Sequence, residues 1–298
     1  MNGIITNKNA SNSTNETRVP EIAMFNRTIE SHDGLNLNIS IWPASNPKAT
    51  LFYIHGIQSH SGWLFETGPF LAAQGINVIA MDRRGSGLSE GMRGHAESVD
   101  DLLKDYKCAW EFSLGLSNGI PLTVLGQSFG GSILAALLCR YELECNSAIF
   151  SAPALGQQRF RYEQYALNAR RARKGLGQIQ LPLRDVEYSA DEKYLAFIAN
   201  DVFINRSITG SMASTMVEIE DIYFQNKLDL ESIGFPIHFI EPLSDSIIDM
   251  AFARGVIEPF VGLHTHKIDV HSHYMEFSHK RKDLWRTIEK ICLSERDQ

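Results

Sequence analysis

Residues 122–131 read Leu-Thr-Val-Leu-Gly-Gln-Ser-Phe-Gly-Gly, an apolar run that ends in a Gly-x-Ser-x-Gly motif. Residues 132–139 continue as a run of helix formers. A buried strand that turns directly into a helix at this motif holds its serine on a sharp, strained turn. The flanking glycines avoid clashes with neighbouring backbone, and the helix N-terminus favours negative charge nearby. We therefore take Ser128 as the candidate nucleophile.

Strand and helix patterns alternate on both sides of this motif. The expected strands are residues 21–30, 35–42, 50–54, 75–81, 122–125, 147–151, 236–241 and 267–270. The expected helices are residues 66–74, 99–116, 132–139 and 280–292. An Asp-Gly pair at positions 33 and 34 favours a tight turn between the first two strands. Alternation over this length predicts an α/β fold with a mostly parallel sheet covered by helices on both faces.

One long segment interrupts the alternation. Residues 153–230 lack strand signals and carry helical patterns at 188–204 and 211–224. We expect a helical cap inserted into a core built from residues 21–152 and 231–298. Residues 1–20 are rich in Asn, Ser and Thr without the apolar stretch of a signal peptide, so we expect a disordered tail.

Composition excludes several classes of protein. The chain has 298 residues, a hydrophobic content of 44% and a net charge of −7. An acidic balance argues against nucleic acid as a partner, because phosphate binding normally requires basic excess. No stretch approaches the roughly 18 apolar residues of a membrane span, which predicts no transmembrane segment. The four cysteines lack paired spacing, so we expect reduced thiols and a cytoplasmic location.

A serine nucleophile needs a base and an acid that orients the base, and in this type of fold the chain order is serine, acid, histidine. The acid should follow the strand at 236–241, because the carboxyl ends of parallel strands share one edge of the sheet. Asp245 occupies that place. Asp249, one helical turn later, is the alternative acid, and Asp269 is expected inside the next strand.

The base should come from the last loop, where His271 and His273 lie between the final strand and helix. We favour His273, because the aromatic and apolar residues after it can pack the loop down; His271 is the alternative. His264, His266 and His279 are further histidines nearby. They suggest a metal site, but no cysteine or carboxylate stands at ligand spacing, so we expect no metal and no cofactor.

The oxyanion formed by nucleophilic attack needs two N–H donors, one after the nucleophile and one after the third strand. We expect the backbone amides of Phe129 and Ile57 to supply these donors.

Taken together, these motifs resemble the serine hydrolases of the α/β-hydrolase superfamily, within the branch of monoacylglycerol lipases, lysophospholipases and S33-type serine aminopeptidases. The matching residues are 55–62, 82–89, the serine motif, Ser244-Asp245 and residues 273–277. The chain departs from the family pattern in two places: Pro242-Leu243 replaces a glycine usual before the acid, and the glycine usual before the histidine is absent at His271-Ser272.

The resemblance implies an α/β-hydrolase fold and hydrolysis of a lipid-like or small acyl ester through an acyl-enzyme. The same residues would also serve an acyltransferase, thioesterase or peptidase of a biosynthetic pathway. A ligand-binding homologue without activity is a third possibility, against which the ordered serine, acid and base argue.

The cap carries an excess of positive charge in an acidic chain: Arg159, Arg161, Arg170, Arg171, Arg173 and Lys174. Arg170, Arg173 and Lys174 have the spacing of one helical face. The simpler interpretation is a solvated surface. The alternative is that these charges receive a phosphate or carboxylate of the substrate, or bring the cap to an anionic membrane.

Overall fold

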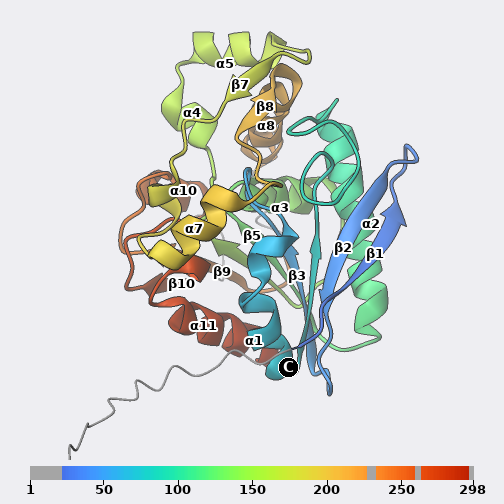
Figure 1. Ribbon diagram of the computed structural model, residues 1–298. Helices are drawn as coiled ribbons and strands as arrows, with labels where there is room; N and C mark the ends of the chain where they lie inside the picture. Colours follow the sequence, from blue (N-terminus) through green and yellow to red (C-terminus); the bar gives the residue numbers. More distant parts are fainter. Residues whose placement is uncertain (1–21, 227–232, 259–262, 295–298) are drawn as a thin grey trace, which may run out of the picture.

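An eight-stranded sheet runs through the centre of the protein (Figure 1). The computed structural model describes residues 22–226, 233–258 and 263–294; the tail expected at 1–20 and the end of the expected cap, 227–230, lie outside the described residues. The strand order is β1-β2-β4-β3-β5-β6-β9-β10. The strands are β1 (Phe25–Glu30), β2 (Asn36–Trp42), β3 (Ala49–Ile54), β4 (Ile76–Met81), β5 (Leu122–Gln127), β6 (Ser147–Ser151), β9 (Ile237–Pro242) and β10 (Leu263–Ile268).

Only the first strands run antiparallel. The β1–β2 and β2–β4 pairs are antiparallel, and the pairs from β4 to β10 are parallel. The predicted α/β fold with a mostly parallel sheet is therefore confirmed. All carboxyl ends of the parallel strands consequently meet at one edge, where the candidate residues were expected.

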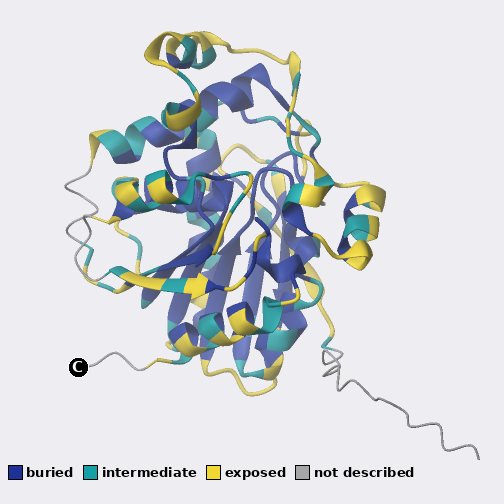
Figure 2. Ribbon diagram, turned by 90° about the vertical axis from the view of Figure 1, so that its left-hand side faces the viewer, coloured by how far each residue is buried: buried dark blue, intermediate teal, exposed yellow. Residues whose placement is uncertain are grey.

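Helices cover both faces of the sheet. One face packs on α1 (Thr67–Ala73) and α11 (Arg281–Leu293), and the other packs on α2 (Val99–Ser117), α3 (Phe129–Arg140) and α10 (Met250–Ile257). In strand β3, Phe52 faces α2 and α3, whereas the next residue, Tyr53, faces α11. Successive side chains of a strand point to opposite faces of the sheet, so an apolar strand needs helices on both faces. Figure 2 shows the result: buried strands lie between helices whose outer faces are exposed.

Residues 153–226 lie mainly above the carboxyl edge of the sheet. They form α4 (Gln157–Arg161), α5 (Gln164–Ala172), β7 (Gln178–Gln180), α6 (Asp185–Tyr188), α7 (Glu192–Asn200), β8 (Ser207–Thr209) and α8 (Gly210–Gln225). The expectation of no strands here was wrong, since β7 and β8 pair in a small antiparallel sheet. Strands of three residues carry too little periodicity to be recognised in sequence. The helix expected at 188–204 is shorter, because residues 189–191 break it after α6.

Two further boundaries differ from expectation. Strand β10 begins at Leu263 and ends at Ile268, so Asp269 lies just beyond the strand and not inside it. Helix α5 ends at Ala172, so the predicted common helical face of Arg170, Arg173 and Lys174 does not exist. The backbone of Arg173 leaves the helical conformation, with φ −81° and ψ 74°.

The junction of β5 and α3 is sterically closed. A Cβ at Gly126 would lie 2.5 Å from the carbonyl oxygen of Gly130, and a Cβ at Gly130 would lie 2.1 Å from that of Ile54. At Gly131 it would lie 2.4 Å from the Cβ of Pro153. Ser128, between these glycines, has φ 54°, which a residue with a side chain adopts only where its surroundings hold it.

Replacement of Gly130 by alanine tests this constraint. We expect Gly130→Ala to lower the free energy of unfolding by about 2–4 kcal/mol, because the added methyl group must displace the backbone at the end of β3. Urea denaturation followed by circular dichroism measures the change.

Gly115→Ala is the matched control. Gly115 lies in α2, and nothing lies within 4 Å of a Cβ added there. The alanine should raise the stability by up to about 1 kcal/mol through its higher helix propensity. Equal stability of the Gly130→Ala protein and the wild type would contradict the steric argument.

Candidate active site

Ser128 lies at the carboxyl edge of the sheet, between the last residue of β5 and the first residue of α3. Its backbone is held on three sides: its N–H donates to the Ser151 carbonyl at 3.1 Å, and its carbonyl accepts from Ala154 and Gly131. These bonds keep the strained conformation in place. Ser128 is 7% exposed and lines the pocket described below.

His273 lies against this serine. The distance from His273 Nε2 to Ser128 Oγ is 2.9 Å, although 145 positions separate the two residues. On the other side of the ring, His273 Nδ1 lies 2.6 Å from Asp245 Oδ2. With the proton on Nδ1, the imidazole donates to the carboxylate and leaves Nε2 free to accept the serine proton.

Asp245 is fixed by the loop after β9. Its Oδ1 accepts from the amides of Ile247 at 2.8 Å and Ile248 at 3.0 Å, so Oδ2 is left for His273. Burial by itself raises the pKa of Asp245. The charge and hydrogen bond of His273 and the two amides outweigh burial and hold this pKa below its ordinary value. The side chain is therefore a carboxylate at neutral pH.

The alternative base, His271, and the alternative acid, Asp249, have other hydrogen-bond partners. His271 is exposed, and its Nδ1 lies 2.7 Å from the hydroxyl of Ser244. Asp249 caps α10, where Oδ1 accepts from the amide of Phe252 at 2.7 Å. The structure thus brings together Ser128, Asp245 and His273.

Aromatic packing holds the histidine loop down. The ring of Phe277 stacks on Trp63 and on Tyr194, at centroid distances of 5.3 and 4.5 Å. Tyr274 and Met275 are also buried, as the choice of His273 assumed. Beneath them, the Tyr53 hydroxyl donates to the buried Glu276 carboxyl group at 2.6 Å, and burial raises the pKa of Glu276.

The expected oxyanion donors lie beside the serine. Phe129 is the first residue of α3, so its N–H has no acceptor within the helix. Ile57 lines the same pocket as Ser128 and Phe129. The sequence motif at 55–62 therefore lies next to the serine turn.

A buried arginine supports this loop from behind. Arg83 is 1% exposed, and its guanidinium donates to the carbonyls of Gly56 at 3.0 Å and Ile57 at 2.8 Å. The guanidinium also lies 5.7 Å from the ring centre of Phe129. No carboxylate of the described residues forms an ion pair with Arg83. Its guanidinium thus donates to the two loop carbonyls and to the hydroxyl of Ser86.

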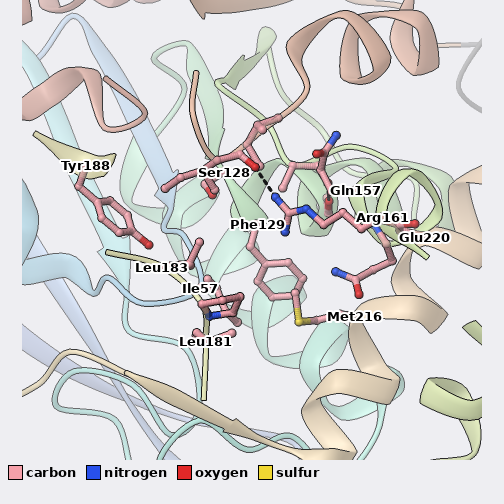
Figure 3. A pocket seen from close by; sticks show the side chains of 16 residues that line it. Ile57, Ser128, Phe129, Gln157, Arg161, Leu181, Leu183, Tyr188, Met216 and Glu220 are labelled. Carbon is pink, nitrogen blue, oxygen red and sulfur yellow. Dashed lines mark hydrogen bonds between the residues drawn. The ribbon is translucent and has the colours of Figure 1, made fainter. Parts of the chain in front are cut away.

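An apolar pocket opens above Ser128 (Figure 3). About 590 Å³ of non-atom space lies in and in front of it, open solvent included, of which about 70 Å³ can hold the centre of a water-sized molecule. Its apolar walls are Ile57, Phe129, Ala154, Leu181, Pro182, Leu183, Tyr188, Met216, Ile247 and Ile248. Gln157, Gln158, Arg161 and Glu220 contribute polar groups. Burial raises the pKa of Glu220 to about 7, although the amides of Gln158 and Arg159 and the Arg159 guanidinium oppose this rise.

Metal-ligating residues gather away from this pocket. Within the described part of the chain, one group has three ligand atoms close enough to share an ion: His32, Asp33 and Asp101. Asp33 and Asp101 are already paired with Arg84 and His32. A separate histidine cluster, which does not bring three ligand atoms this close together, joins His238 of β9 to His264 and His266 of β10, with 3.0 Å between His238 Nδ1 and His266 Nε2.

The comparison with known families agrees with this architecture. The sequence profile of the family described as serine aminopeptidase, S33 matches residues 45–270. The fold and site define an α/β-hydrolase. The chain belongs to the S33 family of these proteins.

Curated relatives match over shorter segments. The monoacylglycerol lipase of Mycolicibacterium smegmatis is 29% identical over 123 residues, which cover 41% of this chain and 44% of that protein. The human monoglyceride lipase is 34% identical over 113 residues, covering 34% of each chain. The matched segments thus span less than half of these relatives.

Solved structures match over nearly the whole chain. A soluble variant of monoglyceride lipase from Saccharomyces cerevisiae, in complex with a substrate analog, superposes with a TM-score of 0.75 at 17% identity, covering 92% of this chain and 95% of that one. The monoacylglycerol lipase of Paleococcus ferrophilus gives a TM-score of 0.71 at 17% identity, covering 87% and 98%. The α/β-hydrolase fold is thereby confirmed. No helix in residues 22–226, 233–258 or 263–294 combines the length and apolar character that crossing a bilayer requires.

The sequence motifs pointed to Ser128, Asp245 and His273 but not to the residues packed around them. Arg83 belongs to the motif at 82–89 but received no role, because its target is the backbone of a distant loop. Glu220 and Met216 of α8 line the pocket without any motif that would reveal them. The one available signal was an arginine two residues after the end of a buried strand.

The histidine cluster predicts a pH-dependent stability. Burial, with smaller contributions from His266 and His264, lowers the pKa of His238 to about 4. The unfolded chain takes up a proton near the ordinary pKa of about 6.5, whereas the folded protein resists protonation. The contribution of His238 is therefore complete above about pH 6.5 and decreases as the pH falls toward 4. Since the ring is only partly buried, we expect a loss of about 1–2 kcal/mol.

Urea unfolding of wild type and His238→Val at neutral and acidic pH measures this loss, which should be smaller in the variant. His279→Gln is the control, because His279 is exposed and lies outside the cluster. An identical loss of stability on acidification in wild type and His238→Val would refute the assignment.

Proposed function

We propose that this protein hydrolyses carboxylic esters of a lipid-like or small acyl substrate, of the monoacylglycerol or lysophospholipid type. The observation that carries the proposal is the hydrogen-bonded chain from Ser128 through His273 to Asp245, at the base of an apolar pocket. The names of the curated relatives, monoacylglycerol lipase and monoglyceride lipase, support the same class of substrate.

In the proposed mechanism, His273 Nε2 removes the proton of Ser128 as Oγ attacks the ester carbonyl carbon. Asp245 holds the imidazole in the required tautomer and stabilises its protonated form. The amides of Ile57 and Phe129 bind the oxyanion. His273 then gives its proton to the departing alcohol, and water activated by the same imidazole releases the acyl group.

The apolar walls favour an acyl chain as the group bound above Ser128. Burial of each methylene of such a chain contributes about 0.8 kcal/mol to the binding free energy, so the pocket favours a lipid-like acyl group. An acyltransferase, thioesterase or peptidase would use the same three residues. Product analysis with competing alcohols and amines detects acyl transfer, and thioester and amide substrates detect a thioesterase or a peptidase.

Ser128→Ala tests the proposal most directly. We expect turnover of a short-chain aryl ester to fall by at least about 10⁴-fold and covalent labelling by a fluorophosphonate to disappear, because the attacking oxygen is lost. His273→Gln should reduce turnover to a similar extent, since nothing then removes the serine proton.

His271→Gln and Asp249→Asn are the matched controls. Each changes the alternative base or acid, and each should retain turnover within a few-fold of wild type. Undiminished hydrolysis by Ser128→Ala would exclude the proposed nucleophile, and a loss in His271→Gln equal to that in His273→Gln would exclude the proposed base.

We propose that Arg83 is a positioning residue for the oxyanion site, because it holds the carbonyls on both sides of the Ile57 amide. We expect Arg83→Met to lower kcat by about 10²–10³-fold with a smaller change in KM, because the amide acts mainly on the transition state. Arg83→Lys should recover part of kcat by keeping the charge. Steady-state kinetics with the aryl ester measures both parameters.

Arg84→Lys is the control within the same motif. The Arg84 guanidinium pairs with Asp105 and Asp33 and does not contact the Ile57 loop. This variant should lose stability and keep kcat. If Arg83→Met and Arg84→Lys lowered kcat by the same factor, Arg83 would act only through folding.

A further inference from the structure

Five of the six basic residues between positions 159 and 174 fall into two groups, and the sixth, Arg173, lines neither of the cavities described here. Those of the first group face carboxylates of α8: Arg159 pairs with Glu220 at 3.3 Å and Asp221 at 2.5 Å, Arg171 with Asp221 at 2.9 Å, and Lys174 with Glu218 at 3.5 Å. Their charges are locally neutralised, and they hold α4 and α5 against α8. They have a structural role in the cap.

Arg161 and Arg170 form the second group. Neither has a carboxylate within ion-pair distance among the described residues. Arg161 Nη2 donates to the backbone carbonyl of Ile247, which fixes the side chain but leaves its other donors available. The Arg170 guanidinium lies over the ring of Tyr162, 4.5 Å from its centre, and the buried Arg170 Nε has no hydrogen-bond partner.

Both guanidinium groups line one cavity. This outer cavity, bounded also by Tyr162, Gln180 and Ser246, shares Gln158, Arg161, Leu181, Pro182, Leu183, Met216 and Ile247 with the pocket above Ser128. Figure 3 shows Arg161 beside the apolar wall of that pocket. Arg161 thus lines both the pocket above Ser128 and the outer cavity, whereas Arg170 lines the outer cavity and not the pocket above Ser128.

Glu187 and Gln158 are two further polar side chains of the outer cavity. Glu187 is its carboxylate, but the backbone amide and guanidinium of Arg184 already engage Glu187. Gln158 is 5% exposed, and its Oε1 has no hydrogen-bond partner among the described residues. An unpaired buried acceptor is costly, so a ligand hydroxyl that donates to Oε1 would be favoured.

We propose that Arg161 and Arg170 form a binding subsite for an anionic group on the alcohol part of the ester. The acyl chain occupies the apolar region near Ser128, and the alcohol part extends into the outer cavity. There, a hydroxyl of the alcohol donates to Gln158 and a phosphate accepts from the two guanidinium groups.

This subsite rests on the proposed function, and it would determine which of the proposed esters the protein prefers. The acyl–oxygen bond is the one that breaks, and the alcohol leaves with a proton from His273. The phosphate ester stays intact and departs with the alcohol. An acyl ester whose alcohol carries a phosphate is therefore preferred to the neutral monoacylglycerol with the same chain.

The test compares three short-chain monomeric substrates with one acyl group: a monoacylglycerol, its phosphate ester and an analogue with a carboxylate in place of the phosphate. The measured quantity is the ratio of kcat/KM for each anionic substrate to that for the neutral one. We expect the double variant Arg161→Gln, Arg170→Gln to lower the phosphate ratio about 10–100-fold, the size of one or two charge-assisted hydrogen bonds. The ratio for the carboxylate analogue shows whether the subsite recognises phosphate in particular or any anion.

Arg173→Gln is the matched control, because Arg173 belongs to the same cap and lines neither cavity. The control should keep the wild-type ratio. Equal ratios in the double variant and wild type would overturn the subsite. So would equal losses in the double variant and Arg173→Gln, which would indicate only a general effect of charge.

Binding to vesicles of anionic phospholipid separates the subsite from membrane attachment. If the double variant loses vesicle binding but keeps its substrate ratio, the arginines serve the membrane and the proposal is wrong. Failure of the proposed function has a different signature, since wild type would then neither hydrolyse the neutral ester nor react with a fluorophosphonate.

Discussion

The architecture of the site depends on a steric constraint at one turn. Ser128 keeps a positive φ because β5, α3 and the end of β3 approach so closely that no side chain fits at Gly126 or Gly130. The parallel pairing of β3 with β5 and of β5 with β6 supplies that close approach. The turn is therefore a product of the whole sheet, and the hydroxyl it carries points to the edge where the other site residues gather.

A second constraint is the buried charge of Arg83. A guanidinium removed from water requires strong partners, and here backbone carbonyls of the Ile57 loop provide them. The same logic separates the arginines of the cap. Arg159 and Arg171 are satisfied by carboxylates of α8, whereas Arg161 and Arg170 keep free donors beside a cavity. The paired arginines thus support the cap, whereas Arg161 and Arg170 are available to a ligand in the cavity.

Much of the fold followed from local pattern, because buried parallel strands such as β5 and β6 are short apolar runs bounded by turn residues. The site was predictable to the extent that chain order places residues at strand ends. Asp245 and His273 were found in this way, and the structure places both beside Ser128. The end of α5 and the β7–β8 pair were not predictable. The carbonyls of Gly175 and Gly177 accept from Ser211 and Gly210, and Ile208 is buried in the core, so tertiary contacts outweigh weak local preferences.

The sequence by itself determined the serine turn, the alternation that builds the sheet and the short sets of candidates for acid and base. These depend on interactions between near neighbours along the chain. Only the tertiary structure placed His273, and not His271, within hydrogen-bond distance of Ser128. It also joined Arg83 to the Ile57 loop and separated the paired from the unpaired arginines of the cap. The physical reason is that charge pairing, burial and hydrogen bonding across 145 positions of chain arise from packing, which no local pattern encodes.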